Sequence, residues 1–323
     1  MRVTFFGTRG SVPVSGPDKV KAGGNTTCLR VESPCLPKGW SLAVDAGSGF
    51  VPFSAQVLAE GAYIEVHVLQ THYHFDHLQG LLLSPLLYRT DVPLTMWGPL
   101  ESGFGPREVL KAVMRPPFHP VDLSKIGSHL TCREIECPDA RILIVHPYGG
   151  GTMQTLEEYE RGNGMVKFGK KGEYPRKECL VIRMLYSNHP ERTITYRFEE
   201  NPTGKVFVFL TDHENTDTLS MNFKRHLENA DLLVMDSQYP RKKYELFTAG
   251  FGHGTPDYCV RTAVETGAKR LGLTHHDPMS SDKDIEQIVL DAYSKLDEYH
   301  GKDGLHLTNE TIFACRDYQV VDL

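Results

Sequence analysis

The sequence lacks the marks of a disulfide-stabilised, thiolate-metal or membrane-spanning protein. Its seven cysteines are odd in number, and no two have the C-x-x-C spacing. That pattern is typical of free thiols in a reducing compartment and argues against a disulfide framework or a cysteine zinc knuckle. No apolar run approaches the roughly 20 residues that a membrane helix needs, and the N-terminal segment turns at Gly7, too early for a signal peptide. We therefore expect a cytoplasmic protein without membrane partners.

The sequence also lacks an excess of basic residues. Asp and Glu outnumber Lys and Arg by 41 to 35, which gives a net charge of -6. This balance argues against a general nucleic-acid or membrane-surface binder. The length of 323 residues, with no evident internal repeat, predicts a single domain over 1–323 with an insertion around 115–178. The glycine-rich stretch 149–172 has mixed charge, and we interpret it as a surface insertion that could act as a lid over a site.

Histidine is plentiful, and within the stretch Thr71–His77 the six residues His72–His77 hold three imidazoles and one carboxylate. The preceding run 64–70 has the pattern of a buried strand. On extended backbone His72 and His74 point to the same side, because side chains alternate with period two. Asp76 and His77 follow as the chain leaves the strand. One ion cannot easily use all four groups, so the spacing predicts two neighbouring metal ions.

Further polar groups follow apolar, strand-like runs along the chain. Open α/β sheets place their sites at the carboxyl ends of strands, so we expect these groups to gather there. Asp45 ends the run 41–44, and we expect it to orient a metal-bound imidazole from behind. The other candidates that follow such runs are His189, Asp212, Asp236 and His275.

Two N-terminal loops carry polar side chains that could receive an anion. Arg9 and Ser11 lie in the loop 7–11, and Asn25 lies in the loop 23–27. The simpler explanation is that these residues satisfy their own loop backbone, as turn residues commonly do. Both interpretations stay open at the level of the sequence.

The chain carries, in this order, Asp45, the cluster from His72 to His77, and then His189, Asp212 and His275. This succession of motifs resembles that of the metallo-β-lactamase fold superfamily. The resemblance spans nearly the whole chain and implies an α/β fold, a four-layer αββα sandwich with two metal ions at one edge of its sheets. It implies that one ion is held by His72, His74 and His189, and the other by Asp76, His77 and His275, with Asp212 bridging both. The neighbouring His276 leaves the choice of the last ligand open.

Within that superfamily, His253-x-Thr255 at the start of a helix resembles the ribonuclease Z and cyclic-phosphodiesterase branch. This implies a phosphodiesterase that acts by attack of a metal-bound hydroxide, with Asp76 and His253 catalytic and Thr255 binding substrate. Thr255 could cap the helix at the same time. Asp76, Asp212 and a bridging hydroxide would offset only part of the charge of two divalent ions. The net positive charge that remains suits an anionic substrate. Zinc or manganese is expected, because a di-iron site would want a carboxylate in place of His74.

The sequence favours a small or cyclic phosphodiester, such as a cyclic nucleotide, as substrate. The first alternative is a tRNA 3′-processing endoribonuclease of the ribonuclease Z type. RNA is the less favoured partner, because gripping tRNA needs clustered basic residues, and the 149–172 stretch is mixed in charge. The second alternative is a non-catalytic metal-binding sensor, against which the complete ligand set argues. Lactam or thioester hydrolysis would leave His253-x-Thr255 unexplained, and a homodimer is compatible with the sequence.

Overall fold

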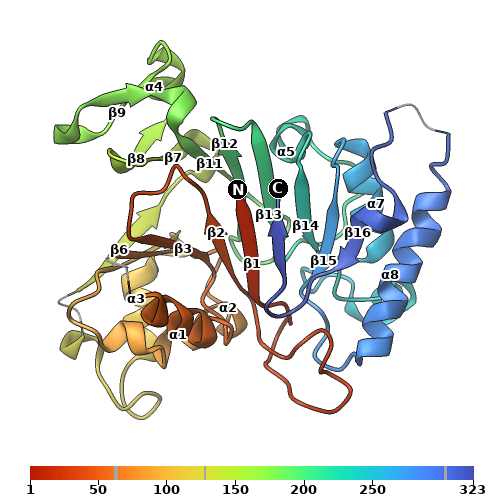
Figure 1. The fold of residues 1–323 in the computed structure, drawn as a ribbon. Coiled ribbons are helices and arrows are strands. Elements are labelled where there is room, and N and C mark those ends of the chain that lie inside the picture. Colours follow the sequence, from red (N-terminus) through yellow and green to blue (C-terminus); the bar gives the residue numbers. More distant parts are fainter. Residues whose placement is uncertain (62–64, 127–128, 302–303) are drawn as a thin grey trace.

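Two β-sheets pack face to face and carry helices on their outer faces in the computed structural model, which describes residues 1–61, 65–126, 129–301 and 304–323 (Figure 1). The predicted four-layer αββα sandwich is therefore confirmed. The first residue of the predicted strand 64–70 lies outside the described residues. No helix in the described part of the chain is long and apolar enough to cross a membrane.

The first sheet has seven strands and comes mostly from the N-terminal part of the chain. Its order is β17-β1-β2-β3-β4-β5-β6, antiparallel from β17 to β3 and parallel from β3 to β6. The bounds are β1 Arg2–Gly7, β2 Cys28–Glu32, β3 Trp40–Val44, β4 Glu65–Leu69, β5 Leu94–Pro99, β6 Leu130–Ile135 and β17 Val320–Asp322. The helices that cover its outer face are α1 Phe50–Glu60, α2 Phe75–Leu82 and α3 Pro106–Val113.

The second sheet has eight strands in the order β16-β15-β14-β13-β12-β11-β7-β8, with β13 to β16 parallel. The bounds are β7 Arg141–His146, β8 Gly150–Thr155, β11 Leu180–Tyr186, β12 Ile194–Glu200, β13 Lys205–Leu210, β14 Leu232–Asp236, β15 Leu271–Thr274 and β16 Ile312–Ala314. The helices packed on its outer face are α5 Met221–Leu227, α7 Pro256–Glu265 and α8 Asp282–Asp297.

The main core lies between the two sheets and is built by period-two alternation. Phe5 and Val31 of the first sheet meet Tyr196, Phe198 and Phe207 of the second. Each strand turns alternate side chains to the core, so its intervening residues face the outer helices. The hydroxyl of buried Tyr196 donates to the backbone carbonyl of Gln70 over 2.7 Å. This bond ties the second sheet to the chain just after β4, where the histidine cluster begins.

Residues 150–178 leave β7 as an edge excursion that contains β8, α4 Leu156–Arg161, β9 Met165–Lys167 and β10 Glu173–Pro175 (Figure 1). Its Tyr159 and Phe168 pack on Ile144 and Val181, which face outward from the second sheet. Val145 of β7 pairs with Leu180 of β11, and the excursion begins at this end of β7.

The excursion therefore starts at the end of β11 that is remote from His189. β11 runs on from Leu180 to Tyr186, a length of about 20 Å at 3.3 Å per residue, before the chain reaches His189. The structure gives no support to the hypothesis of a lid over the site. Within the predicted insertion 115–178, β6 and β7 are strands of the two sheets. A single domain over 1–323 stays a prediction, which the shared core between the sheets supports.

Candidate metal centre

The histidine cluster lies in the loop between β4 and α2. The strand ends at Leu69, so His72 and His74 stand on the extended loop behind it rather than on the strand itself. Their rings still face each other, with centroids 4.5 Å apart. Helix α2 begins at Phe75 and places Asp76 and His77 in its first turn, both buried. His72 and His74 were predicted to face a different part of the site from Asp76 and His77. The change from loop to helix at Phe75 separates these two pairs.

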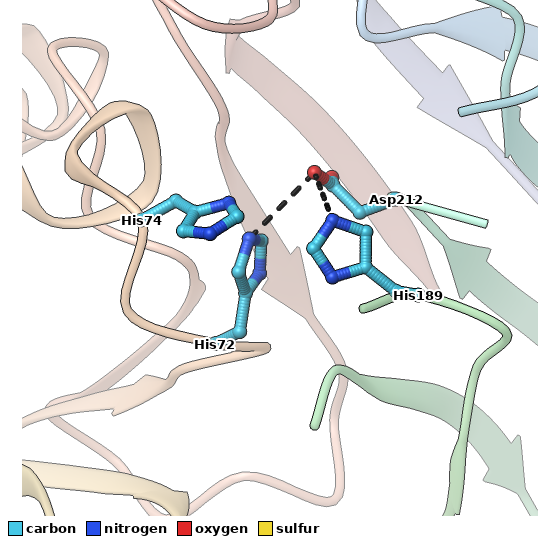
Figure 2. Close-up of side chains that lie close together, drawn as sticks. All are labelled: His72, His74, His189 and Asp212. Carbon is cyan, nitrogen blue, oxygen red and sulfur yellow. Dashed lines mark ion pairs between the residues drawn. The ribbon is translucent and has the colours of Figure 1, made fainter. Parts of the chain in front are cut away.

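The first group of donors is His72, His74, His189 and Asp212, whose ligand atoms lie within 4.8 Å of one another. In Figure 2 the imidazoles of His72 and His189 converge on the carboxylate of Asp212. Asp212 Oδ2 lies 3.6 Å from His72 Nε2 and 3.9 Å from His189 Nε2. These are the four residues that the resemblance assigns to the first ion and to the bridge.

The second group is Asp76, His77 and His275, again with ligand atoms within 4.8 Å. Asp212 Oδ1 lies 3.3 Å from the Nε2 atoms of both His77 and His275. The two oxygens of Asp212 therefore face different groups, which is the arrangement expected of a bridging carboxylate. The neighbouring His276 has Nε2 2.9 Å from the carbonyl of Cys315, so the structure places His275 rather than His276 in the cluster.

Asp45 lies behind the cluster and orients two of its imidazoles. Its Oδ2 accepts a 2.8 Å hydrogen bond from Nδ1 of His77. The hydroxyl of Thr71 donates to the same carboxylate over 2.9 Å and lies 3.1 Å from Nδ1 of His72. Because the Thr71 proton points to Asp45, its oxygen accepts from His72. Both Nδ1 atoms are thus donors, and the Nε2 lone pairs of His72 and His77 face the cluster.

The donor set fits metal ions. His72 Nε2 is buried and has no hydrogen-bond partner among the described residues. His77 Nε2 lies only 3.3 Å from Nε2 of His275, a close approach of two ring nitrogens that a shared cation would stabilise. Burial opposes charge on Asp212, yet the imidazoles around it hold its pKa well below the usual range. A cluster of imidazole lone pairs and carboxylate anions suits zinc or manganese.

His253 lies beside the metal-binding groups and has a carboxylate partner of its own. Its Nδ1 donates to Asp236 Oδ2 over 2.8 Å, and its ring stacks on His275 with centroids 4.9 Å apart. Burial lowers the pKa of His253, but the Asp236 carboxylate outweighs that effect and raises the pKa to about 9. The ring of Tyr239 lies edge-on to His253 at 5.9 Å. His253 is therefore held at the edge of the cluster by its contact with Asp236.

The His189 loop is held by the segment that follows β13. Ser187 Oγ donates to the carbonyl of Asp212 over 2.8 Å, and the amide of Asn188 donates to Nδ1 of His213 over 3.0 Å. Burial lowers the pKa of His213 to about 3, so its imidazole is neutral and can accept. Gly252 packs on the other side of His189, and a Cβ there would lie 2.2 Å from the imidazole. These contacts fix His189 relative to Asp212.

The residues predicted to bind an anion are used differently in the structure. Arg9 is fully buried and donates to the carbonyls of Gly23, Asp277 and Ser280 over 2.8–3.0 Å. Asn25 donates to the carbonyl of Phe6 over 3.0 Å. These contacts support the simpler explanation for both residues, which is that they hold their own loops.

Ser11 and Thr255 have different surroundings. The Ser11 amide donates to Asp76 Oδ2 over 2.6 Å, and its hydroxyl accepts from Gln238 Nε2 over 3.1 Å, so Ser11 does border the cluster. Thr255 is fully buried and its hydroxyl accepts from Asn215 over 3.1 Å. Thr255 makes no side-chain capping bond at the start of α7. Its contacts do not support direct substrate binding.

Sequence inspection assigned no role to four residues that position the site. Thr71 and Thr193 bond the imidazoles of His72 and His189, whereas His213 and Gln238 bond Asn188 and Ser11 beside the cluster. Asp236 was noticed as a polar strand end, but its pairing with His253 was not predicted. Its position at the end of β14, like that of Asp212 after β13, was the signal that could have suggested the pairing.

Comparison with known sequences identifies the family. The ribonuclease Z of Streptococcus pneumoniae (strain CGSP14) is 36% identical over 254 residues, which cover 71% of this chain and 77% of that protein. The chain belongs to the ribonuclease Z family. A more distant ribonuclease Z, from Haloarcula marismortui, is 25% identical over 293 residues and covers 85% of this chain and 86% of its own length. No family model matches the chain.

Solved structures agree with this membership at the level of the fold. Yeast PDE1 without ligand superposes with a TM-score of 0.62 at 12% identity and covers 100% of this chain and 99% of its own. The metallo-β-lactamase fold protein YhfI from Bacillus subtilis gives 0.60 at 17% identity, with 99% and 98% covered. The ribonuclease Z family member described here therefore has the metallo-β-lactamase fold, and the predicted resemblance is confirmed.

Proposed function

We propose that this protein is a dinuclear metal-dependent phosphodiesterase. The observation that carries the proposal is the position of Asp212, whose two carboxylate oxygens face two separate donor groups. His72, His74 and His189 would hold one ion. Asp76, His77 and His275 would hold the other. The histidine-rich donor set favours zinc or manganese.

Two bound ions would lower the pKa of a shared water and clamp the phosphoryl oxygens of a diester during in-line attack. The chain supplies the geometry for that chemistry. Asp45 fixes the rings of His72 and His77, and the Ser11 amide fixes Asp76. Because the ligand carboxylates only partly offset two divalent charges, the centre attracts an anionic substrate.

His253 is the proposed proton donor. Its Nδ1 is bound to Asp236, so Nε2 is the nitrogen free to act on substrate. From its position on the ring of His275, His253 can donate to a non-bridging phosphoryl oxygen or protonate the leaving alkoxide. Asp76 is proposed to act at the attacking water as well as holding its ion.

A small or cyclic phosphodiester, such as a cyclic nucleotide, is the substrate we propose. The net charge is -6, and the edge excursion 150–178 begins at the far end of β11 rather than beside the centre. Neither feature supplies a basic arm for gripping a large RNA. A tRNA 3′ end is the second candidate, favoured by the 36% identity to the Streptococcus pneumoniae ribonuclease Z.

A substrate panel tests the proposal. The purified zinc and manganese forms would be assayed on 3′,5′- and 2′,3′-cyclic nucleotides, cyclic dinucleotides and precursor tRNA. We expect turnover of at least one small diester that exceeds turnover of precursor tRNA. Faster cleavage of precursor tRNA would select the second candidate. Two bound ions with no turnover of any member would favour a metal-binding sensor over an enzyme.

A further inference from the structure

Three large apolar side chains are exposed on the segment that leads into His253. Leu246, Phe247 and Phe251 are 61%, 73% and 60% exposed, and we call them the aromatic lip. They follow the short helix α6 (Arg241–Lys243), and the turn Tyr244–Thr248 has π-helical hydrogen bonding. Exposed apolar groups gathered in so short a segment commonly mark a binding surface.

The aromatic lip is fixed to the metal centre. Glu214, two residues after Asp212, accepts hydrogen bonds from the amides of Gly250 and Gly252 over 3.1 and 2.6 Å. It also accepts from the hydroxyl of Tyr244. One carboxylate therefore holds both ends of the turn that carries the lip, and this carboxylate belongs to the segment that supplies the bridging aspartate.

The distance from the lip to the cluster is short. A Cβ on Gly252 would lie 2.2 Å from the His189 ring, and Gly252 has a φ of +92°, so this position needs glycine. Neighbouring Cα atoms are 3.8 Å apart, which places the Cα of Phe251 within about 8 Å of the His189 imidazole. The backbone of Phe251 therefore lies within reach of a group attached to a phosphate at the cluster.

The charges near the lip favour an uncharged ring over a second phosphate. Arg241 pairs with Glu245 over 2.7 Å and with Asp257 over 2.6 Å. Lys243 pairs with Asp277. These cations are largely neutralised by neighbouring carboxylates, so they offer little free charge for a phosphate. The aromatic faces are the recognition groups that stay exposed.

We propose that the aromatic lip stacks the nucleobase next to the scissile phosphodiester. This inference rests on the proposed function, because the phosphate must lie at the metal centre. In a nucleotide the base lies one sugar ring away from the phosphate, a reach that suits the spacing between His189 and Phe251. Stacking of a base on an aromatic side chain is tolerant of sequence and commonly adds tenfold or more to affinity. The substrate is therefore a nucleotide ester.

Two esters with the same leaving group test the proposal. Thymidine 5′-(p-nitrophenyl phosphate) carries a base, and methyl p-nitrophenyl phosphate does not. Phe251→Ala and Phe247→Ala are the variants, and Tyr148→Ala is the matched control. Tyr148 is 79% exposed and follows β7 at the end remote from His189. All three side chains are exposed, so the variants are expected to fold.

We expect Phe251→Ala to raise KM for the thymidine ester about tenfold to a hundredfold, from the usual strength of base–aromatic stacking. Phe247→Ala should have a smaller effect, and kcat/KM for the methyl ester should stay within about twofold of the original protein. Tyr148→Ala should change neither. Repeating the assays on a 3′,5′-cyclic nucleotide and on a short single-stranded RNA identifies the source of the base, since KM rises only for the ligand that reaches the lip.

Equal losses on both esters, or no change in KM for the thymidine ester, would overturn the proposal and leave the phosphodiesterase assignment intact. Dissociation of a dimer in the variants with unchanged KM would assign the lip to a second copy and also overturn it. If the original protein hydrolyses neither ester and no member of the substrate panel, the proposed function fails. Calorimetry then compares the binding of thymidine 5′-monophosphate with that of methyl phosphate. Tighter binding of the thymidine compound, with the difference abolished in Phe251→Ala, supports base stacking on the lip. Equal binding of the two compounds overturns it.

Discussion

At the scale of single residues, Asp45 shows how much a carboxylate outside the ligand set can control. It was predicted from its place one strand before the histidines, and it contacts His77 directly and His72 through Thr71. We expect Asp45→Asn to lower metal affinity about 10- to 100-fold, because such partners fix ligand tautomer and orientation. Metal content after dialysis against a graded chelator measures this change.

Asp322→Asn is the matched control for Asp45→Asn. Asp322 also accepts from a side chain, Arg2, but the pair is exposed and distant from the cluster. Its metal content should equal that of the original protein. If Asp45→Asn kept both ions under the same chelator series, the role we assign to Asp45 would be wrong.

His253 separates catalysis from metal binding. We expect His253→Ala to lower kcat on a phosphodiester about 10²- to 10⁴-fold, the usual contribution of a positioned proton donor, with metal content unchanged. Elemental analysis of the variant alongside its steady-state kinetics checks both parts. Loss of an ion in the variant would reassign His253 as a ligand, since its ring lies with Asp212 and His275 in a third possible donor group.

The identities of the candidate ligands could be predicted because donor type and order along the chain are properties of the sequence. The partners of those ligands could not. Thr71 donates to Asp45 and Gln238 donates to Ser11, and only the fold brings these partners near. Arg9 has a side chain of the type that binds anions, but this side chain is buried and its guanidinium donates to three backbone carbonyls. Burial of this kind depends on packing that local sequence does not record.

At the scale of elements, α5 carries a buried histidine that makes stability depend on pH. Burial, with Arg197 and Arg183 nearby, lowers the pKa of His226 to about 3. The unfolded chain takes up a proton below its ordinary pKa of 6.5, whereas the folded chain does not. The free energy of unfolding should therefore fall by up to about 1.4 kcal/mol per pH unit as pH drops from 6.5 towards 3.

His226→Gln should remove this contribution to the pH dependence. Urea unfolding between pH 7 and 5 would give the free energy of unfolding of both proteins at each pH. The informative quantity is the difference between their two slopes of free energy against pH, because the other buried histidines are common to both proteins. Parallel slopes would mean that His226 accepts its proton in the folded state.

Most strands were predictable, because each is a short apolar run bounded by turn residues. The helix α1 was missed although Phe50, Phe53 and Val57 recur at helical spacing and are buried. Its signal was present in the sequence. The three-residue strand β17 was missed for a different reason, since it exists as a strand through its pairing with β1. Short strands of this kind have no periodicity of their own to detect.

At the scale of the whole molecule, the metal centre joins segments from both sheets, so metal should stabilise the entire fold. The candidate ligands come from the loops after β4, β11, β13 and β15 and from the first turn of α2. An ion that binds only the folded chain at about a thousand times its Kd adds about 4 kcal/mol to the free energy of unfolding. We expect chelation to lower the midpoint of thermal unfolding, and zinc or manganese to restore it. An unchanged midpoint after verified metal removal would contradict this expectation.

The place of the edge excursion could not be predicted from composition. Its glycine content and mixed charge suggested a lid, but which end of a sheet an insertion leaves depends on strand direction and register. Val145 pairs with Leu180 at the end of β7 where the excursion begins, β8 returns along β7 as the edge strand, and Tyr159 and Phe168 then pack on the outer face of the second sheet. The register between strands that lie far apart in the sequence is set only when the sheet forms.

The bond from Thr71 to Asp45 links the two ions thermodynamically. The ions that His72 and His77 would hold both depend on the orientation of one carboxylate, Asp45. The first ion to bind would fix Asp45, so the histidine that receives the second ion would already be oriented. Loading should then be cooperative, with a Hill coefficient above one in a zinc titration. Thr71→Val should lower the Hill coefficient without reaching one, because Asp212 still faces both groups, and the variant should populate more of a half-loaded state than the original chain.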